Sequence, residues 1–209
     1  DLFLNFFGLF LPPDLAQKFL ITTILLFLVF AGKRLGSVLL PKKPALVFLV
    51  SAFFIFNPFV YDRMGYGQFG LVLAMGLMTF AVSYLVEYLE KKQNKQILLA
   101  GVFSGFSILF VVHFVFFNLI FYSLFLIITI IRRREYAWKK LIPSLLLVLL
   151  IVSAINFSLI IGFFLNYLGG KDFLNTEITR QDFIAFQTVG RDIWQAFSNV
   201  FLMGGFWGK

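Results

Sequence analysis

The chain has 209 residues, of which 60% are hydrophobic and 13% are charged, and its mean hydropathy is +0.93. Because charged residues make up about a quarter of an ordinary soluble domain, this composition excludes such a domain and indicates an integral membrane protein. The net charge of +8 does not indicate nucleic acid as a partner, since the basic residues flank apolar runs and are expected to meet the headgroups of membrane lipids.

The positions of the basic residues predict the orientation of the chain. Twelve of the eighteen lie in three clusters between apolar runs. The clusters are Lys33, Arg34, Lys42 and Lys43, then Lys91, Lys92 and Lys95, and then Arg132, Arg133, Arg134, Lys139 and Lys140. Cytoplasmic loops of membrane proteins carry such an excess of Lys and Arg, so residues 57–68 and 169–209 are expected outside.

In chain order, the apolar runs predict one interfacial segment followed by helices that cross the membrane. Residues 2–11 end at Pro12 and Pro13 and are too short to span, for which about twenty residues are needed. They are expected to lie in the outer interface. The predicted spans are residues 15–31, 44–60 and 69–86, two short spans within 97–131, and residues 141–167.

Residues 97–131 are divided into two spans because the run contains no charge and has a basic cluster at each end. One helix cannot begin and end on the same side of the membrane, so we expect a tight outward turn near residues 113–118. Gly101 and Gly105, in the first of these spans, match the small-residue pattern of close helix packing. Further along, residues 192–202 have apolar residues at helical spacing and predict an amphipathic outer helix.

The predicted fold class is therefore all-α: a polytopic transmembrane bundle of about six spans plus interfacial amphipathic helices. One transmembrane domain covers residues 1–209, with an outer interfacial segment at 1–14, the six-span bundle at 15–168 and an outer segment at 169–209. The chain begins at Asp1 without Met, and we expect it to be an internal part of a larger polypeptide.

The polar residues of the predicted outer loop form the main candidate site. Asp62 is the candidate catalytic residue, because a carboxylate can act as a base, and Arg63 is expected to bind phosphate oxygens bidentately. Tyr61, Tyr66 and Gln68 are expected to bind substrate beside them. The alternative is a structural turn, in which Asp62 caps the following segment and Arg63 pairs with it or meets lipid headgroups.

His113, the only histidine, is expected at the tip of the hairpin formed by the two short spans. Ionisable groups at membrane depth are costly and suggest function, so we expect His113 to bind substrate in one outer cavity with Asp62, covered by the helix at 192–202. The alternative is a histidine that only lies in the interface. One histidine and no cysteine give no set of metal ligands, so no metal is expected and no cofactor is predicted.

Four segments follow one another in an order that is typical of one class of membrane proteins. They are Pro12-Pro13-Asp14-Leu15-Ala16-Gln17-Lys18, Asn57-Pro58-Phe59-Val60-Tyr61-Asp62-Arg63 with Gly67-Gln68, the hairpin that carries His113, and Gly205-Phe206-Trp207. In this order they resemble polytopic GT-C-type glycosyltransferases, closest to the arabinofuranosyltransferase-like membrane proteins of bacteria and archaea.

The resemblance implies an enzyme of the prokaryotic cytoplasmic membrane that transfers a sugar from a polyprenyl-phosphate donor at the outer face, with Trp207 among the substrate-binding residues. It also implies a catalytic carboxylate in the first outer loop, and that loop is expected upstream of Asp1. Activity would then depend on the upstream loop. Within this chain, Asp62 is the only acid at the right level of the membrane. Two other classes remain open. They are a non-catalytic membrane scaffold and a component of a lipid or solute transporter, although the broken, charged helices of transporters are scarce here.

Overall fold

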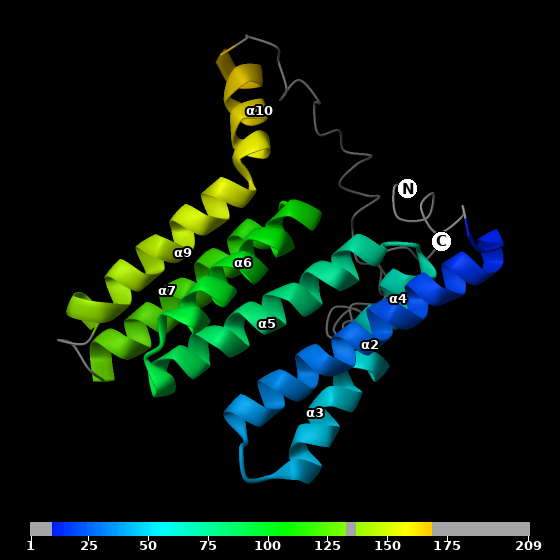
Figure 1. The fold of residues 1–209 in the computed structure, drawn as a ribbon, viewed down its shortest axis with the longest axis horizontal. Helices are drawn as coiled ribbons and strands as arrows, with labels where there is room; N and C mark the ends of the chain where they lie inside the picture. The colour runs from blue at the N-terminus through cyan, green and yellow to red at the C-terminus, as the bar shows by residue number, and fades with distance from the viewer. Residues whose placement is uncertain (1–9, 133–136, 169–209) are drawn as a thin grey trace, which may run out of the picture.

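The structure, a computed structural model, describes residues 10–132 and 137–168. Every regular element in these ranges is helical, which confirms the all-α class (Figure 1). The predicted outer helix at 192–202 and nearly all of the interfacial segment at 2–11 lie outside the described residues. The elements are α2 Pro13–Leu39, α3 Pro44–Phe56, α4 Pro58–Gly65, α5 Phe69–Lys91, α6 Asn94–Phe110, α7 Phe114–Arg132, the π-helical turn η1 Ala137–Leu141, α9 Ile142–Ile155 and α10 Phe157–Leu168.

The lengths and composition of these helices fit an integral membrane protein. The helical stretches Pro13–Leu39, Pro44–Gly65, Phe69–Lys91 and Phe114–Ile131 are each long and apolar enough to cross a bilayer. The pair Lys139–Ile155 and Phe157–Leu165 makes a fifth if its two halves count as one span. The apolar helix α6 has 17 residues, near the lower limit of roughly seventeen for crossing, so the count of six spans stays a prediction.

The helices pack in the sequence α3, α2, α5, α6 and α9, with α7 against α5 and α6 (Figure 1). Small residues let the backbones approach, as expected in membranes, where close packing drives helix association. A Cβ on Gly105 of α6 would lie 2.6 Å from Cδ1 of Ile155 of α9, and one on Gly101 would lie 3.0 Å from Cδ1 of Ile151. The predicted close-packing role of Gly101 and Gly105 is thus confirmed within the bundle.

The first span is longer than predicted, because α2 continues through Gly32 to Leu39. The sequence predicts that the helix ends before Gly32, but this glycine lies at the contact with α3, where an added Cβ would be 3.0 Å from Cα of Ser51. Gly36, one turn further on, lies similarly close to Val47 of α3. The glycines are therefore in the helix because the α2–α3 contact needs small residues.

Two other boundaries also differ from prediction. The turn between α6 and α7 covers Val111–His113, at the start of the predicted 113–118. The hairpin itself is confirmed by a hydrogen bond between the hydroxyls of Ser104 and Tyr122 and by one from Asn118 to Ser107. The last predicted span, 141–167, is not one straight helix, because α9 and α10 meet at Asn156 with a bend of 69°.

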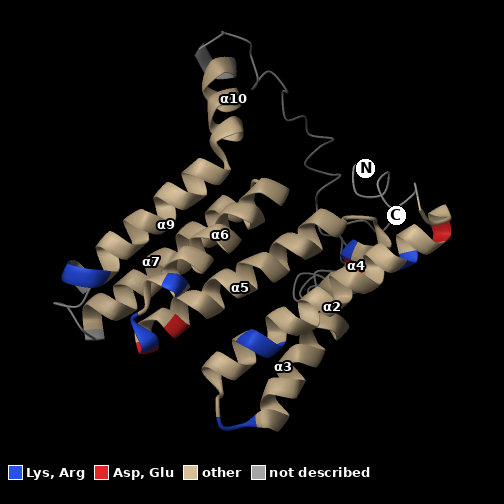
Figure 2. Cartoon of the chain, in the orientation of Figure 1, with Lys and Arg blue, Asp and Glu red and all other residues tan. Residues whose placement is uncertain are grey.

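Charged residues separate to the two ends of the bundle (Figure 2). The described members of the three basic clusters lie at one end, where α2, α5 and α9 each have a terminus, whereas Arg63 and Lys18 lie at the other end. This arrangement is the one that the orientation prediction requires, since all three clusters must reach the same membrane surface. We call the end with the clusters the basic end and the opposite end the Arg63 end.

Candidate functional site

The predicted outer loop is partly helical. Asn57 caps α4, because its Oδ1 atom accepts a hydrogen bond of 2.8 Å from the backbone N–H of Phe59, and Pro58 occupies the first helical position, where its missing N–H costs little. Val60 anchors the short helix by packing into a cluster with Ile24 and Leu28 of α2. The alternative in which Asp62 caps the following segment is wrong, since Asp62 lies inside α4 and the N-cap residue of the following helix, α5, is Gln68.

Arg63 is held at the end of α4 by groups of its own segment. Only 9% of its surface is exposed, and its Nη1 atom donates a hydrogen bond of 3.0 Å to Oε1 of Gln68. Its Nε atom lies 3.7 Å from Oδ2 of Asp62, too far for a hydrogen bond, and has no hydrogen-bond partner among the described residues. Its guanidinium also lies over the ring of Phe59 at 5.2 Å. One strong donor of Arg63 therefore remains available in a buried position.

The structure brings together three of the predicted site residues in this segment, Asp62, Arg63 and Gln68. Gly67 makes the turn possible, because its φ of +71° is in the region that glycine adopts without strain. Tyr66 is exposed, and Tyr61 is 82% exposed. The predicted substrate contact of Tyr61 would therefore have to be made at the surface.

His113 lies at the Arg63 end, exposed in the turn between α6 and α7. That turn is close to the start of α5, since a Cβ on Gly70 would lie 3.9 Å from the carbonyl oxygen of Phe110. The two turns that carry Asp62 and His113 thus share one end of the bundle. The described residues form a groove between α7, α9 and α10 and two hollows beside α2, and neither Asp62 nor His113 lines any of these. A cavity shared by Asp62 and His113 stays a prediction. Trp207 lies outside the described residues.

A lateral groove of about 730 Å³ lies between α7, α9 and α10. Its walls are apolar side chains, including Leu149, Phe163 and Phe164. Two buried amides, Asn118 and Asn156, lie in its lining. Asn156 donates from Nδ2 to the carbonyl oxygens of Gly105 and Val152, whereas its Oδ1 atom is buried and has no partner within the described ranges.

The groove is not predicted from the sequence, although the polar residue Asn156 within an apolar run indicates that this span is unusual. It is the one strongly polar side chain in the apolar run Ile142–Ile155 followed by Phe157–Leu165, and by sequence alone it belongs to a formal glycosylation sequon that a membrane span makes unusable. A polar amide at membrane depth needs partners, and here those partners are at the bend and on α6. Asn156 thus lies both at the bend and in the lining of the groove.

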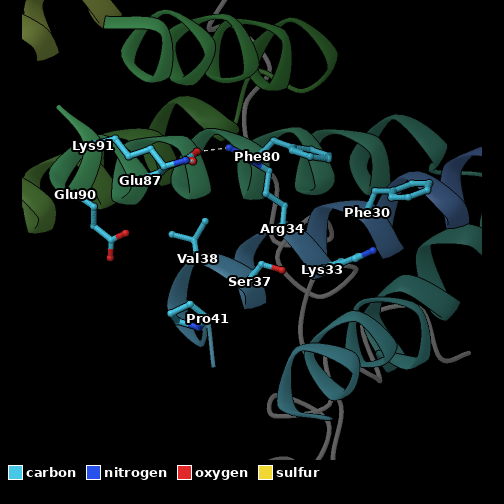
Figure 3. A pocket seen from close by; sticks show the side chains of 10 residues that line it. All are labelled: Phe30, Lys33, Arg34, Ser37, Val38, Pro41, Phe80, Glu87, Glu90 and Lys91. Carbon is cyan, nitrogen blue, oxygen red and sulfur yellow. Dashed lines mark hydrogen bonds and ion pairs between the residues drawn. The ribbon is translucent and has the colours of Figure 1, made fainter. Parts of the chain in front are cut away.

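A second hollow, of about 490 Å³, lies at the basic end between α2 and α5 (Figure 3). Glu87 of α5 pairs there with Arg34 of α2 and with Lys91 one turn along α5. The guanidinium carbon of Arg34 lies 3.8 Å from the centre of the Tyr84 ring, which adds a cation–π contact. The sequence predicts only lipid-facing charge for the basic clusters, and the spacing of Glu87 and Lys91, four residues apart, is the available signal for an ion pair.

No group of three or more His, Cys, Asp or Glu side chains in the described ranges is placed to hold a metal ion. Comparison of the chain with family models, with curated proteins and with solved structures finds no match. The function must therefore be argued from the arrangement of the residues themselves.

Proposed function

We propose that the chain is part of a membrane glycosyltransferase of the GT-C type, which takes a sugar from a polyprenyl-phosphate donor at the Arg63 end of the bundle, the outer face of a prokaryotic cytoplasmic membrane. Such a donor has a long hydrocarbon chain, an anionic phosphate and a polar sugar. A protein that binds it needs an apolar surface inside the bilayer beside a polar, cationic region at the membrane boundary.

The observation that carries this proposal is the lateral groove between α7, α9 and α10. Its lining is almost wholly apolar, and exposed apolar side chains of α9 and α10 flank it, so a hydrocarbon chain can enter it from the bilayer without leaving an apolar environment. A soluble, fully polar substrate would gain nothing from such a surface. A lipid-linked substrate fits this chemistry.

The groove leads toward the turn that carries His113. Ile108, Val112 and Val115 line the groove and lie on both sides of that turn in the chain. An exposed imidazole next to the mouth of the groove can donate a hydrogen bond to a phosphate oxygen or accept a proton from a sugar hydroxyl. Under this proposal, the headgroup of a lipid whose hydrocarbon chain lies in the groove would meet His113 at the turn.

Arg63 supports the proposal from the same end of the bundle. A guanidinium binds phosphate oxygens through paired donors, and the Nε donor of Arg63 is not used by any described residue. Asp62, with 32% of its side chain exposed, remains the candidate catalytic acid or base of this segment. Gln68 would have to exchange its hydrogen bond with Arg63 for one to the substrate.

The same contacts favour a second candidate, a non-catalytic membrane scaffold. Gln68, Asp62 and Phe59, which contact the guanidinium of Arg63, all belong to residues 57–68, which is the pattern of an arginine that stabilises its own turn. In a scaffold, Arg63 would matter for stability and not for ligand binding. The two candidates therefore differ in what substitutions of groove residues do.

The experiment that tests the proposal fills the groove. Ser153 lines it, whereas the neighbouring Ala154 is exposed on α9 and does not. In the full-length protein, Ser153→Trp should lower the rate of sugar transfer from a polyprenyl-phosphate donor at least tenfold, and Ala154→Trp should leave it unchanged. Equal rates for the two variants, with both proteins folded, would show that the groove does not hold the donor, and no transfer by the wild-type protein would favour the scaffold.

A further inference from the structure

Two residues at the basic end of α2 lie between two separate hollows. Lys33 and Ser37 are four residues apart and so share one face of the helix. Both line the hollow of about 490 Å³ toward α5, and both also line a third hollow, of about 550 Å³, toward α3. Both residues are exposed. This pair forms a polar ridge with a hollow on each side, and we call it the α2 ridge.

Both hollows have apolar side chains in their walls, and the hollow toward α5 also has charged ones, Arg34, Glu87, Glu90 and Lys91. Phe30, Val38 and Phe80 line the hollow toward α5. The hollow toward α3 is more strongly apolar, and its lining includes Val29, Val47, Phe48, Ala52 and Ile55. Hydrocarbon can therefore lie in the hollow toward α3 and along the apolar side chains of the hollow toward α5. The ridge itself offers an ammonium group and a hydroxyl.

The ion pairs of this region leave Lys33 as the available cation. Glu87 already holds Arg34 and Lys91, and Figure 3 shows Arg34 directed toward Glu87 while Lys33 is directed away from it. In the described part of the chain, no acidic group lies within ion-pair distance of Lys33. Glu90, which also lines the hollow, lies on the opposite side of it from Lys33 (Figure 3).

The depth of Lys33 along α2 matches a headgroup position. It lies 20 residues after Pro13, the first residue of α2, which corresponds to roughly 30 Å at 1.5 Å per residue. The hydrocarbon core of a bilayer is about 30 Å thick. When the start of α2 is at the boundary of one leaflet, Lys33 is at the boundary of the other, at the level of lipid phosphates.

We propose that the α2 ridge binds one anionic, two-chain phospholipid of the leaflet at the basic end. The ammonium of Lys33 pairs with a phosphate oxygen, and the hydroxyl of Ser37 donates a hydrogen bond to another. One acyl chain lies in the hollow toward α5 and the other in the hollow toward α3. A lone phosphate would use the ridge but not the hollows, and a zwitterionic lipid would bring a second cation close to Lys33.

The test uses the purified full-length protein in detergent, titrated with phosphatidylglycerol, and native mass spectrometry to count bound lipid. Lys33→Gln should weaken retention of one phosphatidylglycerol at least tenfold. Lys42→Gln is the matched control, because it removes the same charge from an exposed residue at the same end of the bundle that lines neither hollow. Equal losses in both variants would overturn the proposal, since they would reflect overall charge.

Two further measurements separate a lipid site from an anion site. Phosphatidylcholine with the same acyl chains should be retained at least tenfold less than phosphatidylglycerol, and equal retention would overturn the role of Lys33. Ala52→Leu, in the hollow toward α3, should weaken retention severalfold, whereas Ala45→Leu, which is exposed and outside both hollows, should not. Displacement of the lipid by an equal concentration of inorganic phosphate would also contradict a two-chain ligand.

Discussion

The side-chain amide of Asn156 donates a hydrogen bond of 3.0 Å to the backbone carbonyl oxygen of Gly105. It joins the bend between α9 and α10 to the helix that α9 packs against. Gly105 has no side chain to cover its carbonyl, and the same missing side chain leaves room for Ile155. This one pair of residues therefore links the bend to the close contact between α6 and α9, and Asn156 also lines the lateral groove.

Asn156→Leu should destabilise the bundle. The substitution removes the hydrogen bonds to Gly105 and to Val152, and side-chain hydrogen bonds between membrane helices contribute about 0.6–2 kcal/mol. The unfolding free energy in mixed micelles should fall by that amount. Ala154→Leu, on the exposed face of the same helix, should leave it within about 0.5 kcal/mol. An unchanged stability of Asn156→Leu would mean that the bend does not need the amide.

Gly105→Ala should also destabilise the bundle, whereas Gly162→Ala should not. An added methyl group at Gly105 would lie 3.1 Å from Cβ and 2.6 Å from Cδ1 of Ile155, and such overpacking costs about 1–3 kcal/mol. At Gly162 an added Cβ would have no described atom outside its own helix within 4 Å, so the better helix propensity of alanine, about 1 kcal/mol, should appear as a gain. Thermal unfolding of the two variants in the same detergent compares them directly, and opposite shifts are the expected result.

Glu87→Gln should weaken the contact between α2 and α5 at the basic end. The variant leaves Arg34 and Lys91 without their shared carboxylate, and Glu87 has only 12% of its side chain exposed. Because Arg34 and Lys91 are more exposed than Glu87, we expect a loss of about 1–3 kcal/mol, below that of a fully buried pair.

The control for this ion pair is Glu90→Gln, which removes an exposed carboxylate one turn away and should change stability by less than about 0.5 kcal/mol. A double-mutant cycle with Arg34→Gln measures the pair itself. Additive effects in that cycle would contradict the energetic coupling of Arg34 to Glu87.

Arg63→Ala and Arg63→Lys distinguish ligand binding from a structural role. Arg63→Ala removes the hydrogen bond to Gln68, so the free energy of unfolding should fall by about 0.5–1.5 kcal/mol. Arg63→Lys keeps a donor that can bond Gln68, so its loss of stability should be smaller. Under the proposed function, Arg63→Lys should still lower donor affinity, because an ammonium lacks the paired donors of the guanidinium. Lys18→Gln, which removes an exposed charge at the same end of the bundle, is the control. Loss of stability with unchanged donor affinity would assign Arg63 to the turn alone.

Cysteine labelling tests the orientation. A cysteine at Gly65, where an added Cβ would have no described atom outside its own helix within 4 Å, should react with an impermeant thiol reagent from outside intact cells. A cysteine at Lys92, at the basic end after α5, should react only after permeabilisation. The chain has no natural cysteine, so each variant gives one signal. Labelling of the Lys92 variant in intact cells would falsify the assignment of the basic end to the cytoplasm.

Hydropathy and charge predict the helical class, the hairpin between α6 and α7 and the common end of the basic clusters, because these depend on properties of single segments. Gly32 shows what local sequence cannot decide: a glycine before two basic residues looks like a helix end, and only the approach of Ser51 explains why α2 continues. The bend at Asn156 likewise depends on a partner 51 residues away. Pairing of Arg34 with Glu87 across 53 residues is equally a product of the packed bundle.

Only part of the candidate site could be predicted from the sequence. The proximity of Asp62, Arg63 and Gln68 follows from their spacing in one short segment, and the structure confirms it. The groove could not be foreseen, since it is formed by α7, α9 and α10 together.

The bend of 69° also decides how much room the molecule takes in each leaflet. With α9 along the bilayer normal, the 12 residues of α10 extend about 18 Å, which is roughly 17 Å sideways and only about 6 Å along the normal. Its exposed Phe163, Phe164 and Leu165 then displace lipid well away from the bundle axis on one side only. The protein then has a larger cross-section in the leaflet that contains α10 than in the other leaflet. It should therefore partition toward curved membranes in which that leaflet is the expanded one.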